Sequence, residues 1–223
     1  MSFIACRFHS NKAAYWGGGA FVSRGQVTFI DCIMHDNEAT NGGAAGYVRD
    51  GFVAFRNCVL NDNQVPGGVG GGAYIQGGTV SFTGSSIRSN TALGAGGLIV
   101  FDGTVTIDSC RIHSNSAGDG GGMYVNGGQV QLTDSDVYDN AANYGGGLNI
   151  QGESSVVVSS SNLYRNSASS TGGAFYLSTR GSGAVHINHV DIYSNSANYV
   201  RATRADLARP RRPCARARFR PYH

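Results

Sequence analysis

The stretch VTFIDCIMHDNEA at residues 27–39 decides the fold, because the sequence returns to it at a fixed spacing. It comes back as VAFRNCVLNDNQV at residues 53–65 and as VSFTGSSIRSNTA at residues 80–92. Within each copy apolar and polar residues alternate, as they do in Val27, Thr28 and Phe29. A period of two is typical of a β-strand and does not fit the 3.6-residue period of a helix. The repeat therefore predicts an array of short strands.

An asparagine marks one position in eight consecutive repeats: Asn11, Asn37, Asn63, Asn90, Asn115, Asn140, Asn166 and Asn195. These asparagines are 26, 26, 27, 25, 25, 26 and 29 residues apart, and the positions ten, eight and three residues before them are apolar in almost every repeat. One repeat of this length cannot bury its own apolar face, whereas stacked repeats bury it as continuous internal columns. We therefore predict an all-β, single-stranded right-handed parallel β-helix, a solenoid of about eight coils of ~26 residues and three strands each, over residues 1–198.

Three further columns have expected structural roles. The asparagines are predicted to point inward at a corner, where each amide bonds to the amides of the coils above and below. The glycine pairs are predicted to mark a second corner, where a positive φ or close backbone approach excludes a Cβ atom; they are 18–19, 42–43, 71–72, 96–97, 121–122, 146–147 and 172–173. A column shared with serine and valine holds Cys6, Cys32, Cys58 and Cys110. Side chains in parallel register do not suit disulfide geometry, so we expect free, buried thiols that do not identify the compartment.

The charge divides the chain into two unlike parts. Residues 1–198 hold 9 Lys and Arg against 13 Asp and Glu, a net charge of −4, whereas residues 199–223 hold eight Arg against Asp206, a net charge of +7. The repeat ends at this boundary, and the Arg-, Pro- and Ala-rich segment 199–223 is expected to be a disordered tail or an artefact of the gene model. Nucleic-acid binding by the folded body is not expected. No apolar run is long enough to span a bilayer.

Two short patterns carry a family resemblance. The tetrapeptides Gly18-Gly19-Ala20-Phe21, Gly42-Gly43-Ala44-Ala45, Gly71-Gly72-Ala73-Tyr74 and Gly172-Gly173-Ala174-Phe175 alternate with Phe8-His9-Ser10-Asn11 and its relaxed forms. They resemble the GGA-x and F-x-x-N repeats of the chlamydial polymorphic outer-membrane proteins, within the pectin-lyase-like β-helix superfamily. The resemblance covers about residues 1–198.

The resemblance implies an extracellular or cell-surface β-helix that adheres to other cells through glycans or surface proteins. A signal peptide and the barrel strands of that family are not found in this sequence, so membrane anchoring is not carried over. Met1 falls inside a coil, which suggests a fragment truncated at the N-terminus. Its bare strand edges are expected to permit end-to-end self-association.

An enzymatic function is the alternative, because many β-helices are polysaccharide lyases or glycoside hydrolases. Such catalysis needs paired carboxylates, or a Ca²⁺ site with a basic residue, in a cleft. Asp36, Asp62 and Asp139 share one exposed column, and Asp134 and Asp136 lie two apart on one predicted strand. Solvated outer faces explain both sets better, and coils of 25–29 residues leave little room for the long loops that build clefts. We therefore expect no catalytic residue, although a degenerate enzyme remains open as an interpretation.

Metal binding receives a similar test. His9, His35 and His113 share the column two residues before the asparagine, and His9 and His35 belong to adjacent coils. The same column continues as Asn61, Arg88, Tyr138, Tyr164 and Tyr193, which indicates a generic exposed position. No metal site and no cofactor are expected.

One row of aromatic residues suggests a binding surface. Phe21, Tyr74, Tyr124 and Phe175 follow the glycine pairs, and they face outward if Ala20, Ala73 and Met123 face inward. An exposed row of rings stacks on sugars or packs against a protein partner, whereas the opposite phase would place these rings in the core. The leading hypothesis is a non-catalytic scaffold for adhesion or glycan binding; a structural repeat without independent function is a third possibility.

Overall fold

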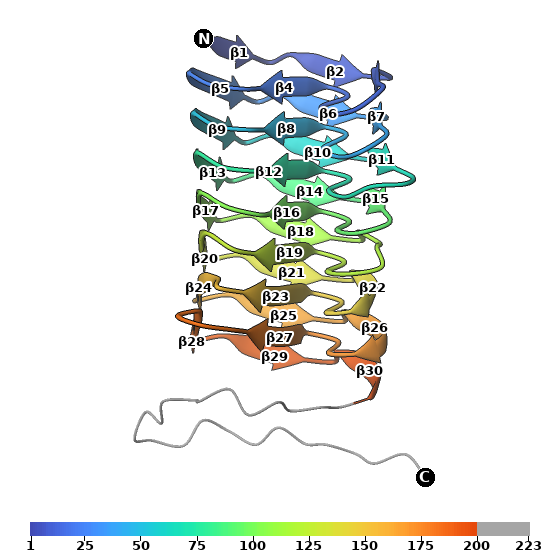
Figure 1. Ribbon diagram of the computed structural model, residues 1–223, viewed down its shortest axis with the longest axis vertical. Coiled ribbons are helices and arrows are strands. Elements are labelled where there is room, and N and C mark those ends of the chain that lie inside the picture. Colours follow the sequence, from blue (N-terminus) through green and yellow to red (C-terminus); the bar gives the residue numbers. More distant parts are fainter. Residues whose placement is uncertain (200–223) are drawn as a thin grey trace.

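The chain folds as a solenoid of eight stacked coils. The computed structural model describes residues 1–199, in which every regular element is a β-strand and every strand pair is parallel. Equivalent strands of successive coils lie one above the other along the long axis (Figure 1), so the predicted parallel β-helix is confirmed. The predicted tail lies outside the described residues, except Tyr199.

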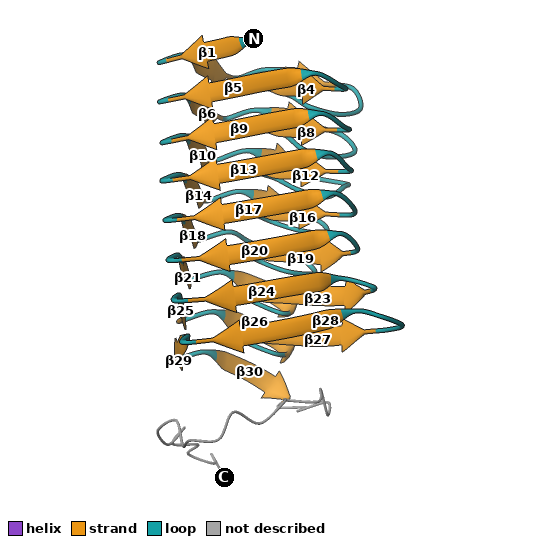
Figure 2. Cartoon of the chain, turned by 90° about the vertical axis from the view of Figure 1, so that its left-hand side faces the viewer, coloured by secondary structure: helices purple, strands orange, loops and turns teal. Residues whose placement is uncertain are grey.

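Two eight-stranded sheets form two sides of the solenoid (Figure 2). The first sheet contains β1 (Ser2–Ile4), β5 (Gln26–Ile30), β9 (Phe52–Arg56), β13 (Thr79–Thr83), β17 (Thr104–Asp108), β20 (Gln129–Thr133), β24 (Ser155–Ser159) and β28 (Ala184–Asn188). The second sheet contains β2 (Arg7–His9), β6 (Ile33–His35), β10 (Val59–Asn61), β14 (Ser86–Arg88), β18 (Arg111–His113), β21 (Asp136–Tyr138), β25 (Asn162–Tyr164) and β29 (Asp191–Tyr193).

The remaining strands form a third side and a fourth sheet. The third side contains β3 (Lys12–Ala13), β7 (Glu38–Ala39), β11 (Gln64–Val65), β15 (Thr91–Ala92), β22 (Ala141–Tyr144), β26 (Ser167–Thr171) and β30 (Ser196–Tyr199). The fourth sheet contains β4 (Ala20–Val22), β8 (Gly46–Val48), β12 (Ala73–Ile75), β16 (Leu98–Val100), β19 (Met123–Asn126), β23 (Leu148–Gly152) and β27 (Phe175–Thr179). Most coils therefore hold four strands, one more than predicted, because a short strand follows the asparagine.

The core consists of columns of like residues. Phe3, Phe29, Phe55 and Phe82 stack with ring centroids 5.2, 4.9 and 4.7 Å apart and nearly parallel planes. Val53, Val80 and other members of the valine column pack in the same cluster, together with the central residues of the second-sheet strands from β2 to β25. Stacking like on like leaves the apolar face of each coil buried by its neighbours, as the repeat predicts.

The asparagines form one continuous hydrogen-bonded file. Asn115 Nδ2 donates to Asn140 Oδ1 and to the carbonyl of Ile87, each at 3.0 Å. In return, Asn115 Oδ1 accepts from the backbone N and the Nδ2 of Asn90, each at 3.0 Å. From Asn37 to Asn166 these side chains are at most 1% exposed. Each buried amide is satisfied only when a copy lies above and below it, so the file enforces the coil register.

The cysteine column forms a second file. Backbone N of Cys58 donates to Ser85 Oγ at 3.0 Å, and backbone N of Cys110 donates to Ser135 Oγ at 3.0 Å. The thiols of Cys6, Cys32, Cys58 and Cys110 are free. Burial raises the pKa of Cys58 and that of Cys110 to about 11, so both thiols stay protonated and unreactive at neutral pH.

Single left-handed residues make the two corners that flank the second sheet. One lies directly before the cysteine column, as Asp31 does (φ 52°), and one directly before the asparagine, as Asp36 does (φ 53°). Such a residue reverses the local direction, so the next side chain enters the core.

Most of the glycine pairs serve close approach and not a positive φ. A Cβ on Gly72 would lie 2.5 Å from the carbonyl oxygen of Gly97 and 3.2 Å from Asn90 Nδ2. In several coils the positive φ belongs to the residue before the pair, such as Gly70 (φ 70°) or Gly120 (φ 61°). In pairs 42–43 and 172–173 it belongs to a member of the pair, Gly43 (φ 63°) or Gly172 (φ 76°). The glycines therefore let the coils stack closely beside the asparagine file.

Candidate functional site

The predicted aromatic row lies on the fourth sheet, on the side that faces away from the main core. We call this column the outer row; in register it contains Phe21, Tyr47, Tyr74, Ile99, Tyr124, Asn149 and Tyr176. Ala73 and Ile75, on either side of Tyr74 in the chain, are 0% exposed and pack in the core. The strand alternation is therefore the one that was expected to turn these rings outward.

Two assignments within the row need correction. Phe175 pairs with Leu148 and packs against the main core, and Tyr176 takes the outer position. Tyr47, absent from the predicted row, pairs with Phe21 and with Tyr74. The glycine pairs 42–43 and 172–173 mislead the alignment, because Ala44-Ala45 and Gly173-Ala174 occupy the equivalent slots in the backbone hydrogen bonding.

The outer row is covered from Tyr47 to Ile99. The Trp16 ring lies 5.0 Å from that of Tyr47 and 5.2 Å from that of Tyr74, and Ala95 belongs to the same buried cluster. Tyr74 is only 8% exposed, whereas Phe21 on the first coil is 50% exposed. The expectation of an open stripe is wrong here: the segment that leads into each strand folds over the row and makes a second, smaller core.

The outer row becomes polar from Tyr124 onward. Asn149, the next member, is fully buried; its Nδ2 lies 3.5 Å from Asp119 Oδ1 and from the carbonyl oxygen of Tyr144. Burial raises the pKa of Asp119, and no ion pair with it occurs within residues 1–199. Burial also raises the pKa of Tyr124, with the nearby Asp119 carboxyl adding to the effect. This region is a buried polar contact between loop and strand.

A second aromatic column lies on the outer face of the second sheet and stays in contact with solvent. Its four rings, which we call the tyrosine ladder, belong to His113, Tyr138, Tyr164 and Tyr193. Successive centroids are 4.6, 4.9 and 5.1 Å apart, and the planes differ by 6°, 2° and 2°. Tyr193 is 50% exposed and the others are half-buried. The column was interpreted as a generic exposed position; three tyrosines in the slot two residues before the asparagine were the signal for it.

Polar side chains accompany the ladder, one in each coil. Two residues before each ring stands a second column, which holds Arg111, Asp136, Asn162 and Asp191. Asn162 Nδ2 donates to Asp136 Oδ1 at 2.8 Å. On the other side, Arg165 makes a bidentate ion pair with Asp139, with both N–O distances 2.7 Å. Its guanidinium lies 4.8 Å from the centroid of Tyr164, within cation–π range.

The electrostatics change along the ladder. Burial lowers the pKa of His113, with nearby Arg88 lowering it further, so this ring stacks on Tyr138 in the neutral form at neutral pH. Burial raises the pKa of Tyr164, and the carboxylate of Asp136 adds to the effect. The ladder therefore begins at a histidine near Arg88 and continues to a tyrosine near the carboxylate of Asp136.

The carboxylates that were considered for catalysis or cation binding lie at corners, each with a local partner. Asp36 contacts His35 Nδ1 at 2.7 Å, Asp62 accepts from Asn61 Nδ2 at 2.5 Å, and Asp139 pairs with Arg165. Asp36 and Asp62 each use one carboxylate oxygen in these contacts, and Asp139 uses both.

Asp134 and Asp136 do not lie on one strand, and two of the histidine rings stack on one another. Asp134 is a left-handed corner residue (φ 47°) that precedes β21. The prediction that it shares a strand with Asp136 is therefore wrong. The rings of His9 and His35 stack 5.2 Å apart. Within residues 1–199 no three His, Cys, Asp or Glu side chains are grouped so that they could hold a metal ion.

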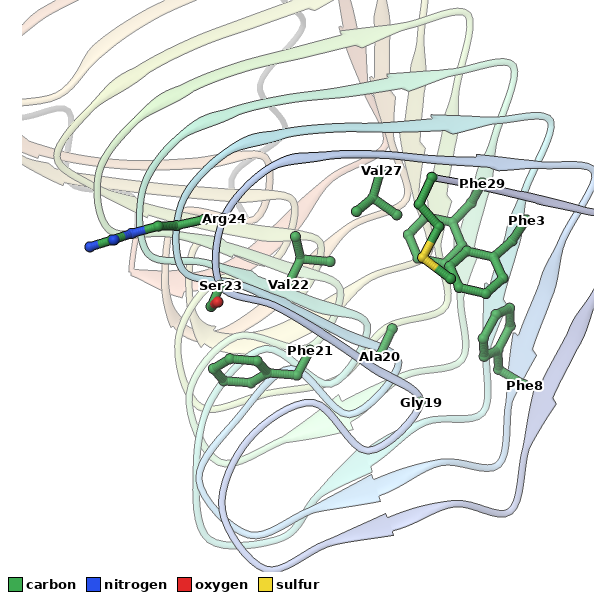
Figure 3. A pocket seen from close by; sticks show the side chains of 11 residues that line it. Phe3, Phe8, Gly19, Ala20, Phe21, Val22, Ser23, Arg24, Val27 and Phe29 are labelled. Atoms are coloured by element: carbon green, nitrogen blue, oxygen red, sulfur yellow. The ribbon is translucent and has the colours of Figure 1, made fainter.

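A hollow of about 360 Å³ opens at the first coil. Its lining includes Phe3, Phe8 and Phe29 from the core columns, with Phe21 and Arg24 at the rim (Figure 3). Most lining groups are apolar members of columns that continue through the other coils. The hollow is thus the solenoid interior seen from its end.

Comparison with known proteins bears on the family alone. The family model for the right-handed β-helix region matches residues 68–206, more than half of the 223 residues. Neither the curated proteins nor the solved structures gave a match. Within the described residues, no helix is long and apolar enough to cross a membrane.

Proposed function

Since this chain belongs to the right-handed β-helix family, we propose that it is a non-catalytic scaffold that binds glycan polymers lengthwise along its tyrosine ladder. The scaffold would act at a cell surface or in the extracellular space, in adhesion to glycans or to glycosylated surface proteins. The repeats support that location through their resemblance to those of the chlamydial surface proteins.

One observation carries the proposal: the ladder repeats its rings once per coil, at centroid spacings of 4.6 to 5.1 Å, on a face that remains in solvent. Because the rings stack on one another, they present edges and hydroxyl groups to a ligand, not open faces. Tyrosine combines an apolar ring with a polar tip, which suits a partner with both C–H and hydroxyl groups. A polymer lying parallel to the solenoid axis meets this combination again at every coil.

The polar column beside the rings supplies the hydrogen-bonding groups that sugar hydroxyls need. Asp136 and Asp191 offer carboxylate oxygens as acceptors, and Asn162 between them offers both a donor and an acceptor. Since all three are on strands of one sheet, a rigid backbone positions them. Binding would then lose little conformational entropy in the protein.

The experiment compares two double variants of the full chain. Tyr138→Ala with Tyr164→Ala shortens the ladder, whereas His9→Ala with His35→Ala removes two stacked rings from the same column at the other end. Binding to a panel of insoluble neutral polysaccharides is measured by depletion from solution. We expect the tyrosine variant to lose about tenfold or more in affinity, since alanine at an anchoring aromatic residue commonly costs above about 1.4 kcal/mol.

The histidine variant should bind like the unchanged chain. Far-UV circular dichroism and thermal unfolding confirm that both variants keep their fold. Equal binding by all three proteins would exclude the ladder as the site, and the absence of binding to every polysaccharide would exclude the function.

A further inference from the structure

The surroundings of the tyrosine ladder are not electrostatically neutral. From Tyr138 to Tyr193 the flanking column holds Asp136 and Asp191, and Asp134 stands at the corner before β21. None of these three carboxylates takes part in an ion pair within residues 1–199. The neighbouring Arg165 and Asp139 neutralise each other, and Arg111 lies one coil before Asp136, beside His113. The part of the face that holds three tyrosines therefore has an excess of negative charge.

The ladder already holds one cation. The guanidinium of Arg165 lies 4.8 Å from the ring centroid of Tyr164 and 5.8 Å from that of Tyr138. The ion pair of Arg165 with Asp139 shows that a carboxylate of this face holds a cation next to the rings. Because the stacked rings present edges and hydroxyl groups to a ligand, an ammonium group on a carbohydrate backbone would pair with the carboxylates and not with the ring faces.

We propose that the polymer bound by the tyrosine ladder is an amino-sugar polysaccharide with free, protonated amines, whose ammonium groups pair with Asp136 and Asp191. This inference rests on the proposed glycan binding and names its substrate class. The two carboxylates stand two coils apart, with Asn162 between them, so charged and neutral contacts alternate along the face. Ring edges and tyrosine hydroxyls bind the sugar backbone in the same way whether the amines are free or acetylated.

The charge of the folded body requires a control in any test of this inference. Residues 1–198 have a net charge of −4, so they would attract a cationic polymer even without a specific contact. A local contact is therefore distinguished from general attraction by comparing the removal of charges at this face with the removal of charges elsewhere. Ionic strength tests the contribution of charge itself, since contacts between exposed charges weaken as salt rises.

The experiment uses two probes with one backbone: chitosan beads, whose amines are free, and chitin beads, whose amines are acetylated and uncharged. The full chain is incubated with each at mildly acidic pH and low salt, and its affinity is measured by depletion. We expect binding to chitosan to be about tenfold tighter than binding to chitin, with the difference shrinking as salt is added. The double variant Asp136→Asn with Asp191→Asn should lose this preference and keep its affinity for chitin.

A matched control removes two charges elsewhere. Asp50 and Asp102 each accept a hydrogen bond from the following glycine N at 2.7 Å, a role that Asn also fulfils. Asp50→Asn with Asp102→Asn should keep the preference for chitosan. If this control loses the preference too, or if the Asp136/Asp191 variant retains it, the local contact is refuted. Equal binding to chitin and chitosan would overturn the amino-sugar inference alone, whereas failure to bind either bead or any neutral polysaccharide would overturn the proposed function as well.

Discussion

The outer row of the fourth sheet and the tyrosine ladder of the second sheet both point away from the main core, yet they differ in their exposure to solvent. Tyr74 in the outer row is 8% exposed, whereas Tyr193 in the ladder is 50% exposed. Both columns satisfy the same strand alternation and both contain stacked or contacting rings. Outward orientation on a strand is therefore not equivalent to exposure.

The cause is the length of chain between strands. Between β5 and β6 only residues 31–32 intervene, which are too few to reach back over the second sheet. Between β11 and β12 the chain runs through residues 66–72, and Val69 from this segment packs against the outer row. A longer corner can fold back and bury apolar surface, which stabilises by about 25 cal/mol per Å². The ladder has no such cover within residues 1–199, so in this part of the chain its rings remain in contact with solvent.

The largest effect that tests this comparison is on stability. Tyr74→Ala should lower the free energy of unfolding by about 3 kcal/mol, because it empties a packed aromatic site. Tyr164→Ala removes a ring at the surface and should cost less than about 1 kcal/mol. Denaturant unfolding of both variants measures the difference. Equal losses would mean that the ladder is as structural as the covered row.

The next test displaces the segment that covers the outer row, without substituting an aromatic residue. A Cβ on Gly42 would lie 2.6 Å from the carbonyl oxygen of Val69 and 2.9 Å from both Trp16 Cζ3 and Tyr74 Cδ1. Gly42→Ala should cost about 2 kcal/mol as an overpacking change. The single tryptophan, Trp16, should then shift its emission to the red as water reaches it.

Gly46 in the same coil provides the control. The nearest atom to a Cβ there is Phe55 Cζ at 3.8 Å, so Gly46→Ala should leave the emission of Trp16 unchanged. A red shift in both variants, or in neither, would contradict the description of residues 42 and 69 as parts of the cover.

The smallest expected effect concerns the polar end of the outer row. Because burial raises the pKa of Asp119 in the folded chain, its protonated form contributes stability that is present below the unfolded pKa and lost as pH rises through the folded pKa. At neutral pH Asp119→Asn should therefore raise the free energy of unfolding, by less than about 1 kcal/mol after allowance for partial exposure.

Below the ordinary pKa of a carboxyl group, the Asp119→Asn variant and the unchanged chain should unfold alike. Unfolding midpoints measured across the acidic and neutral range reveal this convergence. Asp102→Asn, at an exposed turn, is the matched control. A lower free energy of unfolding for Asp119→Asn at neutral pH would contradict the prediction. It would mean that the charged carboxylate stabilises the fold by more than its burial costs.

The fold was predictable because each coil repeats the same chemical demands. Val53, Phe55 and Asn63 each find their counterparts directly above and below, so the columns can be recognised without any coordinates. The two-residue strand Gln64–Val65 was missed, since a pair of residues is too short to show alternation. Phe175 was wrongly assigned to the outer row and Tyr47 was omitted from it, because the glycine pairs of these two coils lie at a different position within the repeat.

The sequence by itself determined the coil, its register and the buried asparagine file, because these depend on identical residues recurring at one spacing. The tertiary structure alone decided which outward side chains stay in water. Covering depends on contacts such as that of Trp16 with Tyr74, between a corner of one coil and the strand of another. No spacing rule relates two such residues, and only the path of the folded corner brings them together.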